Sequence, residues 1–206
     1  MTLISRRNKR LILNEGELLA AAARTGAAVR LAALEELSLY ESLALLRRTT
    51  VLAGMHGSAL INSLFLPAGA ALLQLLPYKV EAGAVFFQGT AEARGVRYVE
   101  WRNRRRDAAV FHWHFLGADY PPERRQAMLE EGSNCCGEVA FFSFWINQDT
   151  RVDSGEWSAA LGEALDSPLN RELRGAAAGG GGGDGRDGRA DAAGRAAAAE
   201  GEAAMA

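Results

Sequence analysis

The chain has 206 residues, of which 49% are hydrophobic, and a chain of this size can bury one globular core. Its formal net charge is −2, which gives no overall attraction to nucleic acid or to an anionic membrane, so neither class of partner is expected. No apolar run is long enough to span a bilayer, and no signal peptide begins at Met1.

Short apolar strands alternate with helical segments through the first hundred residues. The predicted elements are strands at 2–5, 29–32, 51–54, 71–76 and 96–101, and helices at 15–25, 39–48 and 58–64. The strands at 51–54 and 71–76 are apolar without alternation, as expected of central strands that are covered on both faces. The pattern predicts an α/β fold, with a Rossmann-like parallel sheet and helices on both faces.

Several polar residues fit helix-cap patterns. Two pairs have the spacing of a capping box, namely Asn14 with Glu17 and Ser38 with Glu41. Asp149 and Asp153 are two carboxylates without a partner base, and they fit loop or helix-cap roles.

Beyond residue 101 the regular alternation stops. The remaining predicted elements are helices at 122–131 and 157–165, and a segment at 141–148 that fits either a strand or a buried helix. From Gly175 the sequence is almost wholly Gly, Ala, Asp, Arg and Glu, which predicts a tail that packs against nothing. We therefore expect a domain at residues 1–172 and a disordered tail at 173–206.

The strand at 51–54 runs through a glycine-bearing turn into a helix. Backbone N–H groups at such a helix start point at one place and bind anions, phosphate above all. His56 could donate a hydrogen bond there, and Gly57 and Ser58 would offer backbone N–H groups with room for close approach. Taken alone, His56 fits a structural role equally well.

Arg6 and Arg10 follow the first predicted strand. A guanidinium group offers a planar fork of donors for phosphate oxygens. Because parallel strands end at the same edge of a sheet, we expect at least one of these arginines to converge with His56, Gly57 and Ser58. The alternative for each arginine is a solvated basic loop.

The spacing of the candidate ligands argues against a zinc site, and several common enzyme motifs are absent from the sequence. His112, His114, Cys135 and Cys136 would make a poor zinc set, because adjacent thiolates fit a tetrahedron badly, so no metal is predicted. The two cysteines should not bridge each other, since consecutive Cα atoms lie ~3.8 Å apart and a relaxed disulfide needs roughly 4.4–6.8 Å. No G-x-S-x-G, P-loop or G-x-G-x-x-G motif occurs.

Three motifs in the right order resemble glycosyltransferase family 61. They are His56-Gly57-Ser58, residues 62–67 (NSLFLP) and Leu75-Leu76-Pro77-Tyr78. Further segments resemble the family's arginine-bearing loop or one of its branches, at residues 5–6, 10–15, 98–103, 135–136 and 148–153. The resemblance runs from about residue 3 to 153. It departs at Ser58, where alanine is usual, at Gln74, where a glutamate often lies, and at 104–125, which match poorly.

The resemblance implies the C-terminal half of a GT-B glycosyltransferase whose nucleotide-sugar donor is held by Arg6, Arg10, His56, Gly57 and Ser58. It implies inverting transfer of N-acetylglucosamine from UDP-GlcNAc to a glycoprotein or glycan acceptor, with O-mannosylated protein as the expected acceptor of the resembled branch. The catalytic base is expected in a partner domain outside this sequence, so this chain alone should be inactive. No cofactor besides the UDP-sugar substrate is expected.

Relatives of this kind work in the endoplasmic reticulum or Golgi, and the membrane anchor would also lie outside this sequence. On this interpretation the sequence is a fragment or a truncated gene model. The alternative from another class is a non-catalytic or truncated nucleotide-binding module.

Overall fold

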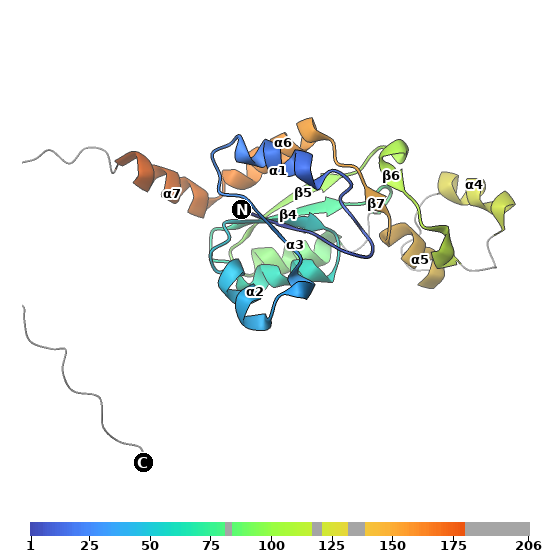
Figure 1. The fold of residues 1–206 in the computed structure, drawn as a ribbon, viewed down its shortest axis with the longest axis horizontal. Helices are drawn as coiled ribbons and strands as arrows, with labels where there is room; N and C mark the ends of the chain where they lie inside the picture. Colours follow the sequence, from blue (N-terminus) through green and yellow to red (C-terminus); the bar gives the residue numbers. More distant parts are fainter. Residues whose placement is uncertain (81–83, 117–120, 132–138, 180–206) are drawn as a thin grey trace, which may run out of the picture.

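A five-stranded parallel sheet forms the centre of the computed structural model, which describes residues 1–80, 84–116, 121–131 and 139–179 (Figure 1). The strands are β1 (Thr2–Ile4), β2 (Arg30–Ala32), β3 (Val51–Met55), β4 (Ala71–Leu76) and β5 (Arg97–Arg102). Their order is β2-β1-β3-β4-β5, and every neighbouring pair is parallel. The predicted parallel sheet is confirmed, and β3 and β4 are both interior strands.

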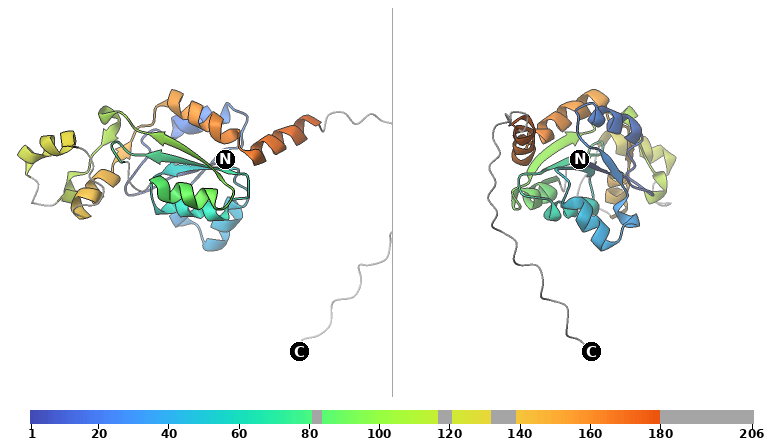
Figure 2. Two further views of the ribbon diagram at one scale, coloured as in Figure 1. Left: turned by 180° about the vertical axis from the view of Figure 1, so that it is seen from behind. Right: turned by 60° about the vertical axis from the view of Figure 1, so that its left-hand side comes forward.

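Helices cover both faces of the sheet (Figures 1 and 2). The helices on the two faces are α1 (Glu15–Ala23) and α6 (Ser154–Leu165) on one, and α2 (Leu39–Leu46), the 3-10 helix η2 (Ser58–Phe65) and α3 (Ala84–Glu92) on the other. Side chains of β4 alternate between the layers: Leu73 packs in a cluster with Trp157, and Leu72 in a cluster with Phe87. This two-layer burial is the physical reason for the unbroken apolar run in β4.

A smaller unit lies beyond the carboxyl ends of the strands (Figure 1). It contains η3 (Arg106–Ala108), β6 (Ala109–Val110), η4 (Trp113–Leu116), α4 (Pro122–Glu131), α5 (Val139–Ile146) and β7 (Asp149–Thr150). Phe144 and Trp145 are its buried centre, with Phe111 and Trp113 packed against them. The ambiguous segment at 141–148 is therefore mainly helical.

The capping-box prediction at Asn14 is wrong. Asn14 stands at the start of α1, but its side chain makes no cap hydrogen bond to that helix. Its amide instead pairs with the backbone of Val152, donating to the carbonyl oxygen and accepting from the N–H, each at 2.9 Å. The side chain thus joins two distant segments, and its Nδ2 also donates to Glu17.

Two α-helices of the described residues were not predicted, namely α3 and α7 (Pro168–Gly179). Helix α7 crosses the expected domain boundary at residue 173, and its residues 171–178 are exposed. The rest of the tail lies outside the described residues, so the boundary stays a prediction. None of the helices in the described part of the chain combines the length and the apolar character needed to cross a membrane.

Replacing Ser38 with alanine is expected to lower the free energy of unfolding by about 1 kcal/mol, because the predicted capping box is formed there. The Ser38 hydroxyl accepts from the Glu41 backbone N–H, and the Glu41 carboxylate accepts from the Ser38 N–H at 2.9 Å. Urea unfolding measures the change. Ser158→Ala, within α6, is the matched control and should change stability little, so an equal loss in both variants would contradict a capping effect.

Candidate functional site at the carboxyl ends of β1 and β3

The structure brings the predicted site residues together at one edge of the sheet. Strands β1 and β3 are parallel neighbours, so the loops that follow them open side by side. Arg10 Nη1 donates a hydrogen bond to the carbonyl oxygen of His56 at 3.0 Å. A Cβ atom built on Gly57 would lie 2.2 Å from Arg10 Nη1 and 3.0 Å from Arg6 Nη1. Ser58 comes next, as the exposed first residue of η2.

This edge is also where the strand order reverses direction. The chain goes from β1 to β2 on one side, and from β3 to β4 on the other. In open α/β sheets, ligands bind at the carboxyl ends of the strands at such a switch point. The topology and the side chains therefore indicate the same place.

The electrostatics of the two arginines favour an anion. Arg6 Nη1 and Arg10 Nε are buried, and neither has a hydrogen-bond partner in the described structure. Burial and the neighbouring Arg6 lower the pKa of Arg10 to about 10, and burial lowers the pKa of Arg6 as well, although Glu35 opposes this. Both side chains remain cations at neutral pH. One bound anion can accept hydrogen bonds from both guanidinium groups and reduce the repulsion between their charges.

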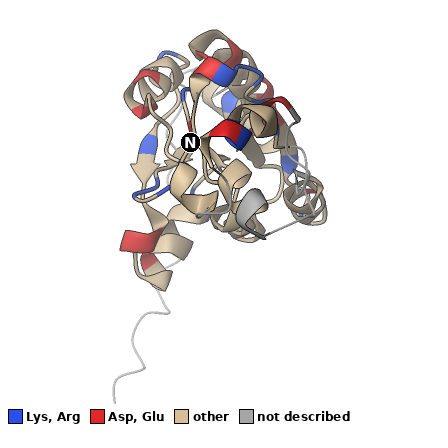
Figure 3. Ribbon diagram, turned by 90° about the vertical axis from the view of Figure 1, so that its right-hand side faces the viewer, with Lys and Arg blue, Asp and Glu red and all other residues tan. Residues whose placement is uncertain are grey.

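Arg7, which lies between them in the sequence, is different. It is exposed and forms an ion pair with Glu36, with 2.6 Å between Nε and Oε1. Figure 3 shows that basic and acidic residues are mixed over the part of the molecule that faces the viewer. The side-by-side arrangement of Arg6 and Arg10 is therefore a local feature, and Arg7 offers a matched control for it.

The loop that carries Arg10 is held by a segment far along the chain. The backbone of Arg10 is left-handed, with φ of 59°. Asp149, which is 6% exposed, accepts from the Leu11 N–H at 2.8 Å and contacts His112 Nε2 at 2.8 Å. Thr150 adds backbone hydrogen bonds to Leu11 and Leu13. The sequence prediction of a simple loop or cap role for Asp149 is thus wrong, because this carboxylate joins the arginine loop to β7.

His56 is a buried side chain at the centre of the site, 5% exposed. Its backbone N–H donates to the carbonyl oxygen of Leu75 at 2.8 Å, and its ring lies edge-on to Phe87. Ring atom Nδ1 is 2.7 Å from the amide nitrogen of Gln74. Burial, and then the charge of Arg10, lower the pKa of His56 to about 4. The ring is therefore neutral at physiological pH.

The lowered pKa of His56 predicts a loss of stability in acid. In the unfolded chain the imidazole protonates below about pH 6.5, whereas the folded chain resists protonation until about pH 4. The unfolded state therefore binds more protons between these values, and stability falls as the pH falls through this window. Urea unfolding across pH 4–7 gives the free energy of unfolding as a function of pH. This free energy should rise more steeply with pH for the wild type than for His56→Gln, by an amount that approaches one proton. Parallel curves would contradict the burial argument.

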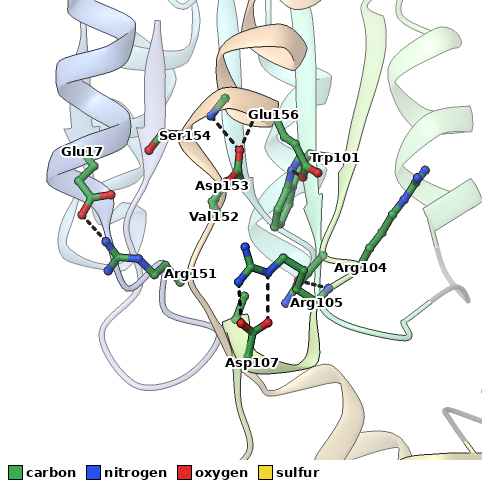
Figure 4. Close-up of a pocket in the computed structure, with 13 residues that line it drawn as sticks. Glu17, Trp101, Arg104, Arg105, Asp107, Arg151, Val152, Asp153, Ser154 and Glu156 are labelled. Atoms are coloured by element: carbon green, nitrogen blue, oxygen red, sulfur yellow. Dashed lines mark hydrogen bonds and ion pairs between the residues drawn. The ribbon is translucent and has the colours of Figure 1, made fainter.

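A separate pocket of about 350 Å³ lies between the loop after β5 and the start of α6 (Figure 4). Two pairs of its charged groups are bound to each other, Arg151 with Glu17 and Arg105 with Asp107, and Arg104 is a further cation in the lining. Asp153 caps α6 by accepting from two backbone N–H groups, as predicted. We assign the anion site to the edge at β1 and β3, because two arginines lie side by side there with buried donors that have no partner among the described residues, whereas two of the three arginines of this pocket are paired.

Metal ligands are not gathered in the part of the chain that the structure describes. There, no three His, Cys, Asp or Glu side chains are close enough to hold an ion. His112 and His114 have ring centroids 5.7 Å apart. Cys135 and Cys136 lie outside the described residues, so the statements about their pairing stay predictions.

The comparisons with known proteins all indicate the same family. Residues 1–73 match the family described as Glycosyltransferase 61, and this segment holds all five predicted site residues. The chain is similar to "Protein O-linked-mannose beta-1,4-N-acetylglucosaminyltransferase 2" of Mus musculus, at 33% identity over 72% of the chain and 28% of the relative. The Homo sapiens relative of that name gives the same figures. The one from Takifugu rubripes is 31% identical over 84% of the chain and 32% of the relative.

Proposed function

Because this chain belongs to glycosyltransferase family 61, we propose that it is the nucleotide-sugar-binding part of an N-acetylglucosaminyltransferase that uses UDP-GlcNAc. The chain spans about a third of the length of the curated relatives it matches, 28% to 32% in the three cases above. Their printed names specify N-acetylglucosamine and O-linked mannose, which supports an O-mannosylated protein as the acceptor. On this proposal the enzyme works in the secretory pathway.

The observation that carries the proposal is a pair of buried guanidinium nitrogens, Arg6 Nη1 and Arg10 Nε, that have no hydrogen-bond partner among the described residues. The diphosphate of UDP would lie against these two cations. The backbone N–H groups of Gly57 and Ser58, at the start of η2, would add neutral donors, and so would His56. Gly57 has no side chain, and this is what lets the two arginines meet at the turn.

The chemistry follows from this charge arrangement. In an inverting transfer, a base removes the proton of the acceptor hydroxyl while its oxygen attacks the anomeric carbon from the face opposite UDP. The bond from the anomeric carbon to the β-phosphate oxygen breaks, and its electrons remain on the diphosphate. Arg6 and Arg10 would stabilise that developing charge as preorganised cations, so the proposal needs no metal ion. We place the catalytic base outside this chain.

Nucleotide titration of the 206-residue chain tests the binding part of the proposal. Chemical-shift changes in NMR should follow the order UDP, then UMP, then uridine, because each phosphate adds charge-assisted hydrogen bonds. UDP-GlcNAc should compete better than UDP-glucose for the same resonances. Equal binding of uridine and UDP, or shifts confined to the pocket of Figure 4, would contradict the assigned site.

The purified chain is expected to bind UDP weakly and to transfer no sugar, because it would provide diphosphate contacts without the catalytic base. Incubation with UDP-GlcNAc and an O-mannosyl peptide, followed by mass spectrometry, measures this. Turnover by residues 1–206 alone would show that the base lies within this chain. Detection of UDP binding in the same sample separates an inactive enzyme part from a misfolded one.

A further inference from the structure

A buried glutamine next to His56 bears on which of the two ring nitrogens carries the proton. Gln74 lies on β4 in register with Gly54, and it is fully buried. Its amide nitrogen is 2.7 Å from His56 Nδ1. A side-chain amide nitrogen carries two protons and cannot accept. Nδ1 must therefore be the unprotonated acceptor, and the proton of the neutral ring lies on Nε2.

The surroundings of His56 also disfavour the doubly protonated ring. Arg10 donates to the carbonyl oxygen of the same residue at 3.0 Å, so a second positive charge would lie beside the first. An imidazolium would also direct its Nδ1–H at the Gln74 amide protons. Burial acts in the same direction, and the pKa of about 4 expresses both effects. The neutral ring with Nε2–H is the form that suits every one of these neighbours.

The orientation of the Gln74 amide is set from the next strand. Its Oε1 accepts from the Tyr98 hydroxyl on β5 at 3.2 Å. The same hydroxyl is 3.1 Å from Glu100 Oε2, and because it has a single proton it donates to Gln74 when the Glu100 carboxylate accepts from Arg102 instead. Burial and Glu100 raise the pKa of Tyr98, so the hydroxyl keeps its proton and remains a donor. When the amide oxygen accepts from Tyr98, the amide nitrogen is the atom that faces His56 Nδ1, as the 2.7 Å contact has it.

We propose that Gln74 is a positioning residue that holds His56 as the neutral Nε2–H tautomer, so that Nε2–H serves as a donor to the diphosphate of the nucleotide sugar. Among the described residues Nε2 has no hydrogen-bond partner, whereas Nδ1 is engaged. The ligand part of this inference rests on the proposed function. The physical gain is a third donor beside Arg6 and Arg10 that adds no third positive charge.

Long-range ¹H–¹⁵N correlation spectra of the ¹⁵N-labelled chain at neutral pH test the tautomer without any ligand. The wild type should show a pyrrole-type Nε2 and a pyridine-type Nδ1 for His56. In Gln74→Met, which cannot donate, the ring should become a mixture of both tautomers. In Gln74→Glu, whose carboxylate only accepts, the proton should move to Nδ1. Wild-type protein with the proton on Nδ1, as would follow if the amide carbonyl faced the ring, would overturn the inference.

Two further variants guard against a misfolded result. Tyr98→Phe keeps the aromatic ring and should also yield mixed tautomers, because it frees the Gln74 amide to turn. Asn170→Leu removes another buried amide, one that donates to Ser167 Oγ at 2.8 Å near the start of α7. It should leave the His56 signals unchanged. An unchanged tautomer in both Gln74→Met and Tyr98→Phe would also overturn the inference.

UDP titration of the same samples separates this inference from the proposed function. Gln74→Met should weaken UDP binding by about two- to tenfold, the usual range for one neutral hydrogen bond. If the wild type shows the Nε2–H tautomer but binds no UDP, the proposed function fails and the positioning role of Gln74 stands. If UDP binds equally well to the wild type and to Gln74→Met, the role of Nε2–H in ligand binding fails.

Discussion

Replacing Arg10 with alanine should weaken UDP binding by about ten- to a hundredfold. A hydrogen bond to a charged group contributes about 1.5–3 kcal/mol, and each 1.4 kcal/mol is roughly a factor of ten in affinity. The fold should tolerate the change, because the substitution removes a half-buried cation that lies beside Arg6. We expect the free energy of unfolding to fall by no more than about 1 kcal/mol, the value of the lost bond to the His56 carbonyl.

Calorimetric titration with UDP and urea unfolding of the same protein measure the two effects separately. Arg10→Lys should restore only part of the affinity, since lysine keeps the charge and lacks the planar fork. Arg7→Ala is the matched control, because Arg7 is exposed and paired with Glu36. Equal losses of affinity in Arg7→Ala and Arg10→Ala would show that general basic charge, and not this site, attracts the nucleotide.

Replacing Gly57 with alanine should remove UDP binding at least as strongly as Arg10→Ala. The new Cβ would lie 2.2 Å from Arg10 Nη1 and 3.0 Å from Arg6 Nη1, so both guanidinium groups would have to move. Both are ends of flexible side chains, so the steric conflict displaces the site and leaves the core intact. The backbone φ of 151° adds strain of roughly 1–3 kcal/mol to the folded state.

Gly95→Ala separates strain from displacement of the arginines. Gly95 also has a positive φ, 65°, but a Cβ there would meet nothing within 4 Å. This control should lower stability by about 1–2 kcal/mol and leave UDP affinity unchanged. If Gly57→Ala bound UDP like the wild type, the two arginines would not be the diphosphate ligands.

The strands and the site edge could be predicted because their signals are local. The apolar run of β4, the turn at His56-Gly57 and the box at Ser38 each depend on residues that are close in the sequence. Parallel strands end at one edge, so the loop with Arg10 was expected beside His56, and the hydrogen bond between them agrees with this. Their role in binding a nucleotide sugar is a proposal that the experiments above test.

The interactions that sequence reasoning missed are those between distant segments. Gln74 faces His56 only because β3 and β4 pair with Gly54 opposite Gln74, and no pattern in the sequence fixes that register. Asn14 looks like a helix cap, but its amide pairs with Val152, 138 residues away. Helix α3 was missed because its sequence, AVFFQGTAE, contains a glycine and β-branched and aromatic residues that lower helix propensity.

The contacts of Asp149 and Thr150 with the arginine loop have a consequence for the order of folding. A growing chain is synthesised from its amino end, and the strands up to β5 are complete by residue 102. The hydrogen bond from Leu11 to Asp149 joins residues 138 apart, so it can form only after residue 149 has emerged from the ribosome. A nascent or shortened chain could therefore assemble the sheet while Arg10 is still unplaced. On the proposed function, nucleotide binding would require that synthesis has passed residue 150, and UDP would stabilise the completed chain over its folding intermediates.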